Sequence, residues 1–196
     1  MRAIRRLLSR TLLLTSALIL LALAGHAVPA NSPDSTNEPR LRLYHTHTGE
    51  RINITYRRGT TYLPEATAQL DYFLRDHRTG DVHHYDPALY DLLSDLTAAV
   101  GRPEAEIEII CGYRTPRSNE FLRTHTAGVA KHSLHIQAKA IDISLPGTDL
   151  LQLRNAALSL HRGGVGYYPQ SGFVHVDIGR VTQWCFGCAG QVSGTQ

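Results

Sequence analysis

Two histidines and an aspartate occur in, or just before, short segments whose apolar residues alternate with other residues. His135 precedes the segment Ala140-Ile-Asp-Ile-Ser144, which contains Asp142, and His175 lies within Phe173-Val-His-Val-Asp177. Such alternation is typical of half-buried strands, on which every second side chain points to the same face. Two imidazoles and one carboxylate are the kind of ligand set that a catalytic zinc takes, with a fourth position left for water. The sequence therefore predicts a zinc site formed by His135, Asp142 and His175.

Three further polar residues could serve such a site. Asp177 shares the strand face of His175, so it could orient that imidazole or accept a proton from the water. Arg114 follows the predicted strand 106–111, where a guanidinium could bind a substrate carboxylate or stabilise an oxyanion. Ser133 lies two residues before His135 and is a candidate hydrogen-bonding group. Plainer explanations exist for the candidate residues: a histidine in an apolar strand could be a core histidine with its hydrogen bonds satisfied, and Asp142 could be a cap or a buried hydrogen-bond acceptor. Arg114 could be a surface charge or part of a salt bridge at a helix end.

The elements that must position these residues are predicted from apolar periodicity and from proline and glycine boundaries. Strands alternate with helices without a regular strand–helix repeat or a phosphate-binding glycine loop, which favours an α+β fold. We expect strands at 41–45, 52–56, 106–111, 140–144, 163–168 and 173–178, and helices at 64–76, 87–100, 116–122 and 148–160.

The remaining histidines and the cysteines are less informative. His45 and His47 could form a metal pair on one strand face, but a polar strand end beside a turn is the favoured interpretation. Cys111 is expected to be a small buried residue of a strand. In an exported protein Cys185 and Cys188 could form a disulfide or bind metal weakly.

The first 27 residues have the layout of a secretory signal peptide: a basic start, an apolar run and small residues. An uncleaved anchor is the alternative, but the run is short for a membrane span. The pair Arg5-Arg6 could indicate twin-arginine export. This segment holds four of the 20 basic residues and none of the 17 acidic ones, so the rest of the chain is close to neutral and nothing points to nucleic acid. Residues 28–40 are expected to be a linker.

Several motifs together resemble one family. Ser133-x-His135, Asp142, Gly163-Gly-Val-Gly-Tyr-Tyr-Pro169, Phe173-Val-His-Val-Asp177 and Gly112-Tyr-Arg-Thr-Pro116 resemble the MepK-type murein endopeptidases. These belong with lysostaphin, the D-Ala-D-Ala metallopeptidases and the hedgehog signalling domain. The likeness implies a peptidase domain over residues 41–184, a tail at 185–196, and a small antiparallel sheet flanked by helices.

The resemblance also implies a chemistry. It assigns Zn²⁺ to His135, Asp142 and His175, and places Arg114 and Ser133 against the substrate. The implied reaction is hydrolysis of murein peptide cross-links in the periplasm by an activated water. The expected partners are murein peptide stems, with no nucleic acid, no stable membrane insertion after leader removal and no second copy of the chain.

The sequence departs from the family pattern at several positions. Ala138 stands where glycine is usual, and Cys111 replaces a common serine. Gly172 and Phe173 occupy the places where the wider group often carries a general base, and neither can take a proton. We therefore expect Asp177 to act as the catalytic base, with His132 as the alternative.

Two other functions stay open from the sequence. A zinc D,D-carboxypeptidase would trim terminal D-alanine and would use Arg114 as a carboxylate clamp. A catalytically silent wall-binding module would explain the missing base, but it would not need to keep His135, Asp142 and His175.

Overall fold

The computed structural model describes residues 38–188. The predicted signal peptide at 1–27 and most of the predicted linker lie outside this range, as do residues 189–196. Within the described range, no helix has the length and apolar character needed to cross a membrane.

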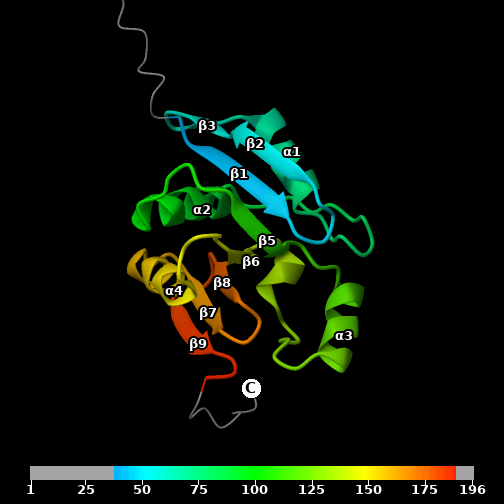
Figure 1. Cartoon of the computed structure of the whole chain (residues 1–196). Helices are drawn as coiled ribbons and strands as arrows, with labels where there is room; N and C mark the ends of the chain where they lie inside the picture. The colour runs from blue at the N-terminus through cyan, green and yellow to red at the C-terminus, as the bar shows by residue number, and fades with distance from the viewer. Residues whose placement is uncertain (1–37, 189–196) are drawn as a thin grey trace, which may run out of the picture. The chain divides into compact units, whose positions relative to one another are not determined.

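A seven-stranded sheet in the order β2-β1-β5-β6-β8-β7-β9 forms the centre of the fold (Figure 1). A separate two-stranded sheet pairs β3 with β4. The strands of the large sheet are β1 (Arg40–His45), β2 (Arg51–Thr55), β5 (Ile107–Cys111), β6 (Ala140–Ser144), β7 (Gly164–Tyr168), β8 (Phe173–Asp177) and β9 (Thr182–Cys185), and those of the small sheet are β3 (Arg57–Arg58) and β4 (Thr61–Tyr62). All six predicted strands are present, but β9 and the two short strands β3 and β4 were not predicted.

The large sheet is mostly antiparallel, but two of its strand pairs are parallel, which the expectation of an antiparallel sheet did not include. β1 pairs with β5 in parallel, and β7 pairs with β9 in parallel, while the other neighbours are antiparallel. A parallel pair needs a crossover connection. For β1 and β5 this connection is the long segment containing α1 and α2. For β7 and β9 the connection includes β8, which pairs with one side of β7, while β9 pairs with its other side.

Within residues 38–188, four α-helices and one short 3-10 helix accompany the sheets. They are α1 (Pro64–Phe73), α2 (Ala88–Ala99), α3 (Pro116–His125), η2 (Leu134–Gln137) and α4 (Leu150–Ser159). The predicted cap of α3 is present, because the Thr115 hydroxyl accepts a hydrogen bond from Ser118 N. The last helix starts two residues later than predicted, since the Asp149 carboxylate caps it by accepting from Leu151 N and Gln152 N.

In β6 and β8, alternate side chains face the apolar core on one side of the sheet and the candidate site on the other. Ile141 lies opposite Val176, and Ile143 lies opposite Val174, in adjacent antiparallel strands. All four are buried in the apolar core; α2 and α4 contact each other, and α4 packs against β7 and β8 (Figure 1). Because side chains alternate, the residues between them face the other side of the sheet. That opposite face carries the candidate site.

Helix α1 ends at Phe73 rather than at the predicted Asp76, because the chain leaves the helix to form a turn. Asp76 is fully buried and its carboxylate accepts hydrogen bonds from Arg78 N at 3.0 Å, Thr115 N at 2.8 Å and the Thr115 hydroxyl at 3.0 Å. Gly80 N closes the turn on Asp76 O at 2.7 Å, with φ +79° at Gly80. The carboxylate thus ties the loop after α1 to the start of α3.

We expect Asp76→Ala to lower the free energy of unfolding by roughly 2–3 kcal/mol at pH 7, since buried donors would lose a charged acceptor. Burial alone would raise the pKa of Asp76, but hydrogen bonds from Ser118 and the backbone lower it. Its contribution is therefore present above about pH 4, the range of a free aspartate, and is lost as the pH falls through the folded-state pKa. Urea unfolding of both proteins at pH 7 and pH 3 measures this difference, which should shrink in acid. Asp81→Ala, at an exposed aspartate of the same loop, is the matched control, and equal losses in both variants would contradict the prediction.

Candidate metal centre

Three donor atoms from separate segments converge on one point. His135 Nε2 lies 3.2 Å from Asp142 Oδ1 and 3.2 Å from His175 Nδ1, and Asp142 Oδ1 lies 2.8 Å from His175 Nδ1. All three residues are buried, with at most 8% of their surface exposed. The structure therefore brings together the three residues that the sequence singled out.

Strand register supplies two of the donors. A row of directly opposed residues crosses the sheet in the order Cys111, Asp142, His175, Gly166 and Trp184. Gly166 leaves a gap in this row, because a Cβ there would lie 2.6 Å from the Trp184 ring. The indole reaches across this gap to the imidazole of His175, with 5.1 Å between ring centroids. Asp142 and His175 are thus direct neighbours in this row, on adjacent strands of the sheet.

The third donor comes from the turn before β6. His135 lies in η2, whose cap is the Ser133 hydroxyl, at 3.3 Å from His135 N. The turn ends at Ala138, which is fully buried and takes the left-handed conformation, φ 50° and ψ 41°. Glycine adopts this conformation routinely, whereas alanine does so rarely. Ala138 nevertheless takes it, and β6 begins two residues later at Ala140, so the substitution noted in the sequence does not divert the chain.

Hydrogen bonds on the far side of each imidazole decide which nitrogen is free. His135 Nδ1 lies 2.7 Å from the carbonyl oxygen of Gly112. A carbonyl only accepts, so Nδ1 carries the hydrogen and Nε2 of the neutral ring presents its lone pair. His175 Nε2 lies 3.2 Å from Asp177 Oδ2 and donates to that carboxylate, which leaves the lone pair on Nδ1. Two lone pairs and a carboxylate oxygen therefore face one another and require a cation between them.

The spacing of the donors fits a zinc ion. In a tetrahedral site with ligand bonds of about 2.0–2.2 Å, ligand atoms are separated by about 3.3–3.6 Å. The two separations from His135 Nε2, 3.2 Å each, are close to this range, and the separation of 2.8 Å between Asp142 Oδ1 and His175 Nδ1 is a hydrogen-bond distance that would widen around an ion. Donor types and hydrogen-bonded outer partners also match those of zinc sites.

A second donor set includes Cys111, whose Sγ lies within 4.8 Å of ligand atoms of His135 and Asp142. Cys111 is buried and unpaired in β5, as predicted. Burial raises the pKa of its thiol to about 12, and the thiol is a poor ligand compared with the thiolate. The donor atoms of the set with His175 lie within 3.2 Å of one another, and His175, with a pKa of about 9, loses its proton to a metal ion more readily than Cys111.

Asp177 lies behind His175, not beside the point where the donors meet. Besides its contact with the imidazole, its Oδ1 accepts from Gly164 N at 2.8 Å and from Gly179 N at 2.7 Å. Burial alone would raise the pKa of Asp177, but these hydrogen bonds and the one from His175 lower it. A Cβ at Gly164 would lie 2.4 Å from Asp177 Oδ2, so the glycine makes room for the carboxylate. These contacts favour an orienting role over a proton-accepting one.

Arg114 and Ser133 lie beside the donors. Arg114 Nη2 donates to the Ser133 hydroxyl at 3.1 Å, and Arg114 N donates to His135 O at 3.2 Å. The guanidinium is buried, its Nε lacks a hydrogen-bond partner, and no acidic side chain within residues 38–188 forms a salt bridge with it. A buried cation without a carboxylate is well suited to bind an anionic group.

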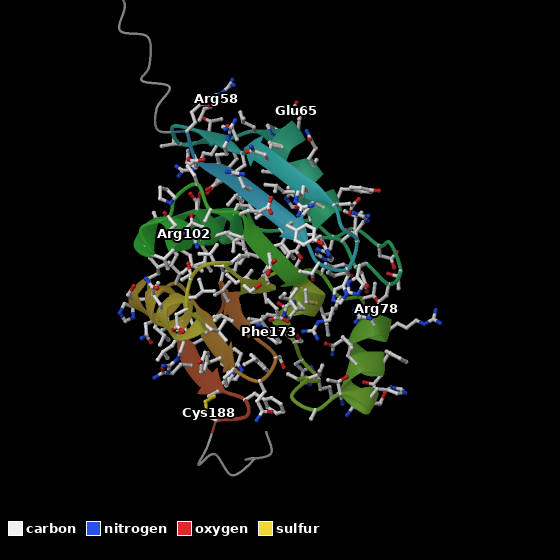
Figure 2. All side chains as sticks on the ribbon, in the orientation of Figure 1. Arg58, Glu65, Arg78, Arg102, Phe173 and Cys188 are labelled. Carbon is white, nitrogen blue, oxygen red and sulfur yellow. A yellow bond between two sulfur atoms is a disulfide. The ribbon has the colours of Figure 1, made fainter. Side chains whose placement is uncertain are left out.

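A cavity of about 490 Å³ opens over these residues. Figure 2 labels two of the residues that line it, Phe173 at the start of β8 and Arg78 in the loop after α1. His132, the alternative base, is exposed and lines the cavity as well.

Some of the contributing groups were not anticipated. The Gly112 carbonyl binds His135, and the Gly164 and Gly179 amides bind Asp177. These are backbone groups, so the sequence indicates only that glycines occur there and not which hydrogen bonds their backbone makes. His47 also lines the cavity, stacked on His77 at 4.1 Å between ring centroids, while His45 is buried. His45 and His47 thus do not share a strand face, because β1 ends at His45.

The metal-free site holds one proton where a cation is needed. Burial alone would lower the pKa of His175, but hydrogen bonds to Asp142 and Asp177 raise it to about 9. Burial lowers the pKa of His135. The pKa of Asp142, which burial would raise, is held below its usual range by both imidazoles. Below about pH 9 a proton on His175 therefore competes with a metal ion.

We expect zinc binding to release about one proton per ion at pH 7 and to weaken about tenfold per pH unit of acidification, since the ligand must be deprotonated. Calorimetry in buffers with different ionisation enthalpies measures the number of protons released. Binding without proton release would contradict this description of the site.

Comparison with known proteins connects this geometry to a family. The sequence model of the family described as "Peptidoglycan L,D-endopeptidase MepK" matches residues 34–184. A protein of Haemophilus influenzae named "Probable peptidoglycan L,D-endopeptidase MepK" is 42% identical over 151 residues, which cover 76% of this chain and 81% of that protein. Proteins of Escherichia coli K12 and Shigella flexneri named "Peptidoglycan L,D-endopeptidase MepK" are each 41% identical over 173 residues, covering 84% of this chain and 94% of theirs. The chain therefore belongs to the MepK family of peptidases.

Proposed function

We propose that this protein is a zinc-dependent peptidoglycan L,D-endopeptidase that hydrolyses peptide cross-links of bacterial murein. The observation that carries the proposal is the convergence of His135 Nε2, Asp142 Oδ1 and His175 Nδ1, two of them with lone pairs fixed by hydrogen bonds behind them. The names of relatives that match over most of the chain support the substrate class and the type of bond.

In this proposal His135, Asp142 and His175 hold the zinc. A bound zinc ion supplies Lewis acidity and lowers the pKa of a water molecule toward neutrality. Asp142 offsets part of the positive charge. Gly112 and Asp177 keep the two imidazoles in the tautomers that present their lone pairs to the same point.

Arg114 and Ser133 bind the substrate. The Ser133 hydroxyl holds the guanidinium at the cavity wall. From there Arg114 can bind a carboxylate of the murein peptide or the negative charge that develops on the attacked carbonyl.

We reassign the role of Asp177 from catalytic base to positioning residue. The imidazole of His175 stands between its carboxylate and the donor atoms, and both carboxylate oxygens already accept hydrogen bonds. His132 lines the cavity and keeps its place as the alternative proton acceptor.

A second candidate is a zinc D,D-carboxypeptidase. The guanidinium of Arg114, whose Nε has no hydrogen-bond partner, favours it, because such an enzyme must bind a terminal carboxylate. The products separate the two functions, since an endopeptidase removes cross-linked dimers and a carboxypeptidase shortens monomers.

The other assignments are part of the same proposal. We infer that residues 1–27 are a leader removed on export, that the mature chain works in the periplasm as a monomer, and that its fold is of the hedgehog and D-Ala-D-Ala metallopeptidase type. Cleavage and secretion of the full-length chain test the first of these.

We expect the zinc-loaded mature protein to convert cross-linked murein dimers to monomers, and His175→Ala to lose both zinc and this activity, because one of three ligands is gone. Digestion of purified murein followed by chromatography of the fragments is the measurement. His125→Ala, at an exposed histidine of α3, is the control and should keep both properties. Shortened monomers with unchanged dimers would favour the carboxypeptidase, and a fully active His175→Ala protein would exclude this site.

Asp177→Asn separates positioning from base catalysis. An amide that keeps the Gly164 and Gly179 hydrogen bonds through its oxygen presents its NH₂ to His175 Nε2, which favours the wrong tautomer. We expect zinc affinity to fall about 10- to 100-fold, the usual range for outer-shell partners of zinc ligands. Competition with a chromophoric chelator measures this affinity. Unchanged zinc affinity with a slowed rate would restore Asp177 as the base.

A further inference from the structure

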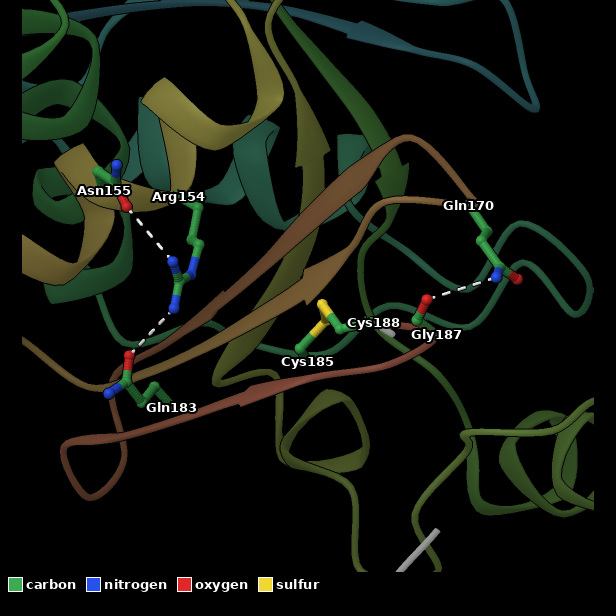
Figure 3. Close-up of a disulfide and its surroundings, with 7 residues drawn as sticks. All are labelled: Arg154, Asn155, Gln170, Gln183, Cys185, Gly187 and Cys188. Carbon is green, nitrogen blue, oxygen red and sulfur yellow. Dashed lines mark hydrogen bonds between the residues drawn. A yellow bond between two sulfur atoms is a disulfide. The ribbon is translucent and has the colours of Figure 1, made fainter. Parts of the chain in front are cut away.

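The chain continues past the family match into a small loop closed by a disulfide. The match ends at Trp184, and Cys185 is joined to Cys188 (Figure 3). The sequence left open whether these cysteines pair or bind metal, and the structure has them paired. The loop carries Phe186 and Gly187 between the two sulfurs.

The backbone of this loop is attached to the sheet that carries His175. Cys185 lies opposite Tyr167 in the pairing of β9 with β7. One residue further, Phe186 N donates to Tyr167 O at 2.9 Å. Figure 3 shows a third attachment, in which Gln170 Nε2 donates to Gly187 O at 3.4 Å. The disulfide and these hydrogen bonds leave the loop little freedom.

The side chain of Phe186 is thereby held at the cavity over the donors. It lines the same cavity as His135, Asp142 and His175. Its ring packs near Tyr168, with 5.8 Å between centroids, and against Gly128, where a Cβ would lie 3.0 Å from the ring. Gly128 belongs to the segment between α3 and η2, so the ring contacts both β7 and that segment.

Phe186 remains 39% exposed despite these contacts. Tyr168, Phe173 and Trp184 line the cavity beside it. An aromatic side chain that is held rigidly and still exposed in a cavity can bury apolar surface of a ligand at little cost in conformational entropy.

We propose that Phe186, positioned by the Cys185–Cys188 disulfide, is a substrate-binding residue that packs on the aliphatic part of a murein peptide stem. The proposal rests on the proposed function, because the ligand is the substrate of that reaction. In this role Phe186 contributes equally to binding of the substrate and of the transition state, and its ring packs on Tyr168 and Gly128, which are not metal-binding residues in the proposed function. Its loss therefore raises KM and leaves kcat unchanged.

The test is steady-state hydrolysis of purified cross-linked muropeptide dimers by zinc-loaded wild type, Phe186→Ala and Phe186→Leu. We expect KM to rise about tenfold in Phe186→Ala and less in Phe186→Leu, with kcat within about twofold of wild type and zinc content unchanged. Phe121→Ala is the matched control, since Phe121 is an aromatic of α3 that is 55% exposed and does not line the cavity. An unchanged KM in Phe186→Ala, or an equal rise in Phe121→Ala, would overturn the proposal.

The role of the disulfide has its own measurement. We expect the double variant Cys185→Ser/Cys188→Ser to show a raised KM and wild type reduced with tris(2-carboxyethyl)phosphine to match it. The double variant itself should be insensitive to this reductant, which is used because a dithiol would compete for the zinc. A double variant with wild-type KM would show that the disulfide does not position Phe186.

Binding separates this proposal from the proposed function. If wild type leaves the dimers uncut, the proposed function fails, and calorimetric titration of the same dimers into wild type and Phe186→Ala still decides the role of Phe186. Weaker binding by the variant supports the contact, and equal binding overturns it.

Discussion

The structure depends on one electrostatic constraint: three electron-pair donors are fixed face to face in a buried position. His135 Nε2, Asp142 Oδ1 and His175 Nδ1 lie within 3.2 Å of one another. The Gly112 carbonyl and the Asp177 carboxylate hold the ring hydrogens on the opposite nitrogens. Such an arrangement is stable only when a cation neutralises it, because a buried charge without a partner is costly. A proton on His175 meets this need in the metal-free protein, and in the proposed function a zinc ion takes its place.

The rest of the fold keeps these donors in place. Ile141, Ile143, Val174 and Val176 bind two strands to the apolar core, and the same strands present Asp142 and His175 on the other face. Packing on one side therefore fixes register on the other, since a slip of one residue would exchange the faces. Asp177 depends in turn on Gly164, whose missing side chain leaves room for its carboxylate.

Local pattern was sufficient to predict a large part of this structure. Alternation located β6 and β8 and placed His175 and Asp177 on one face, and proline at position 116 located the start of α3. Local pattern could not predict contacts between segments that are distant in the sequence. The register that sets Asp142 opposite His175, the parallel pairings of β1 with β5 and β7 with β9, and the hydrogen bond from His135 to Gly112 each join residues that no local period relates. The side of the His175 imidazole on which the Asp177 carboxylate lies was beyond local pattern for the same reason, since sharing a strand face does not specify it.

The most direct test of the central claim is the position of the metal itself. Crystals of the mature protein containing zinc, measured on both sides of the zinc absorption edge, locate the ion by anomalous scattering. The geometry predicts one ion bound at about 2.0–2.2 Å by His135 Nε2, His175 Nδ1 and an oxygen of Asp142. An ion bound by Cys111 in place of His175, or an ion held elsewhere with these three residues uncoordinated, would contradict the account.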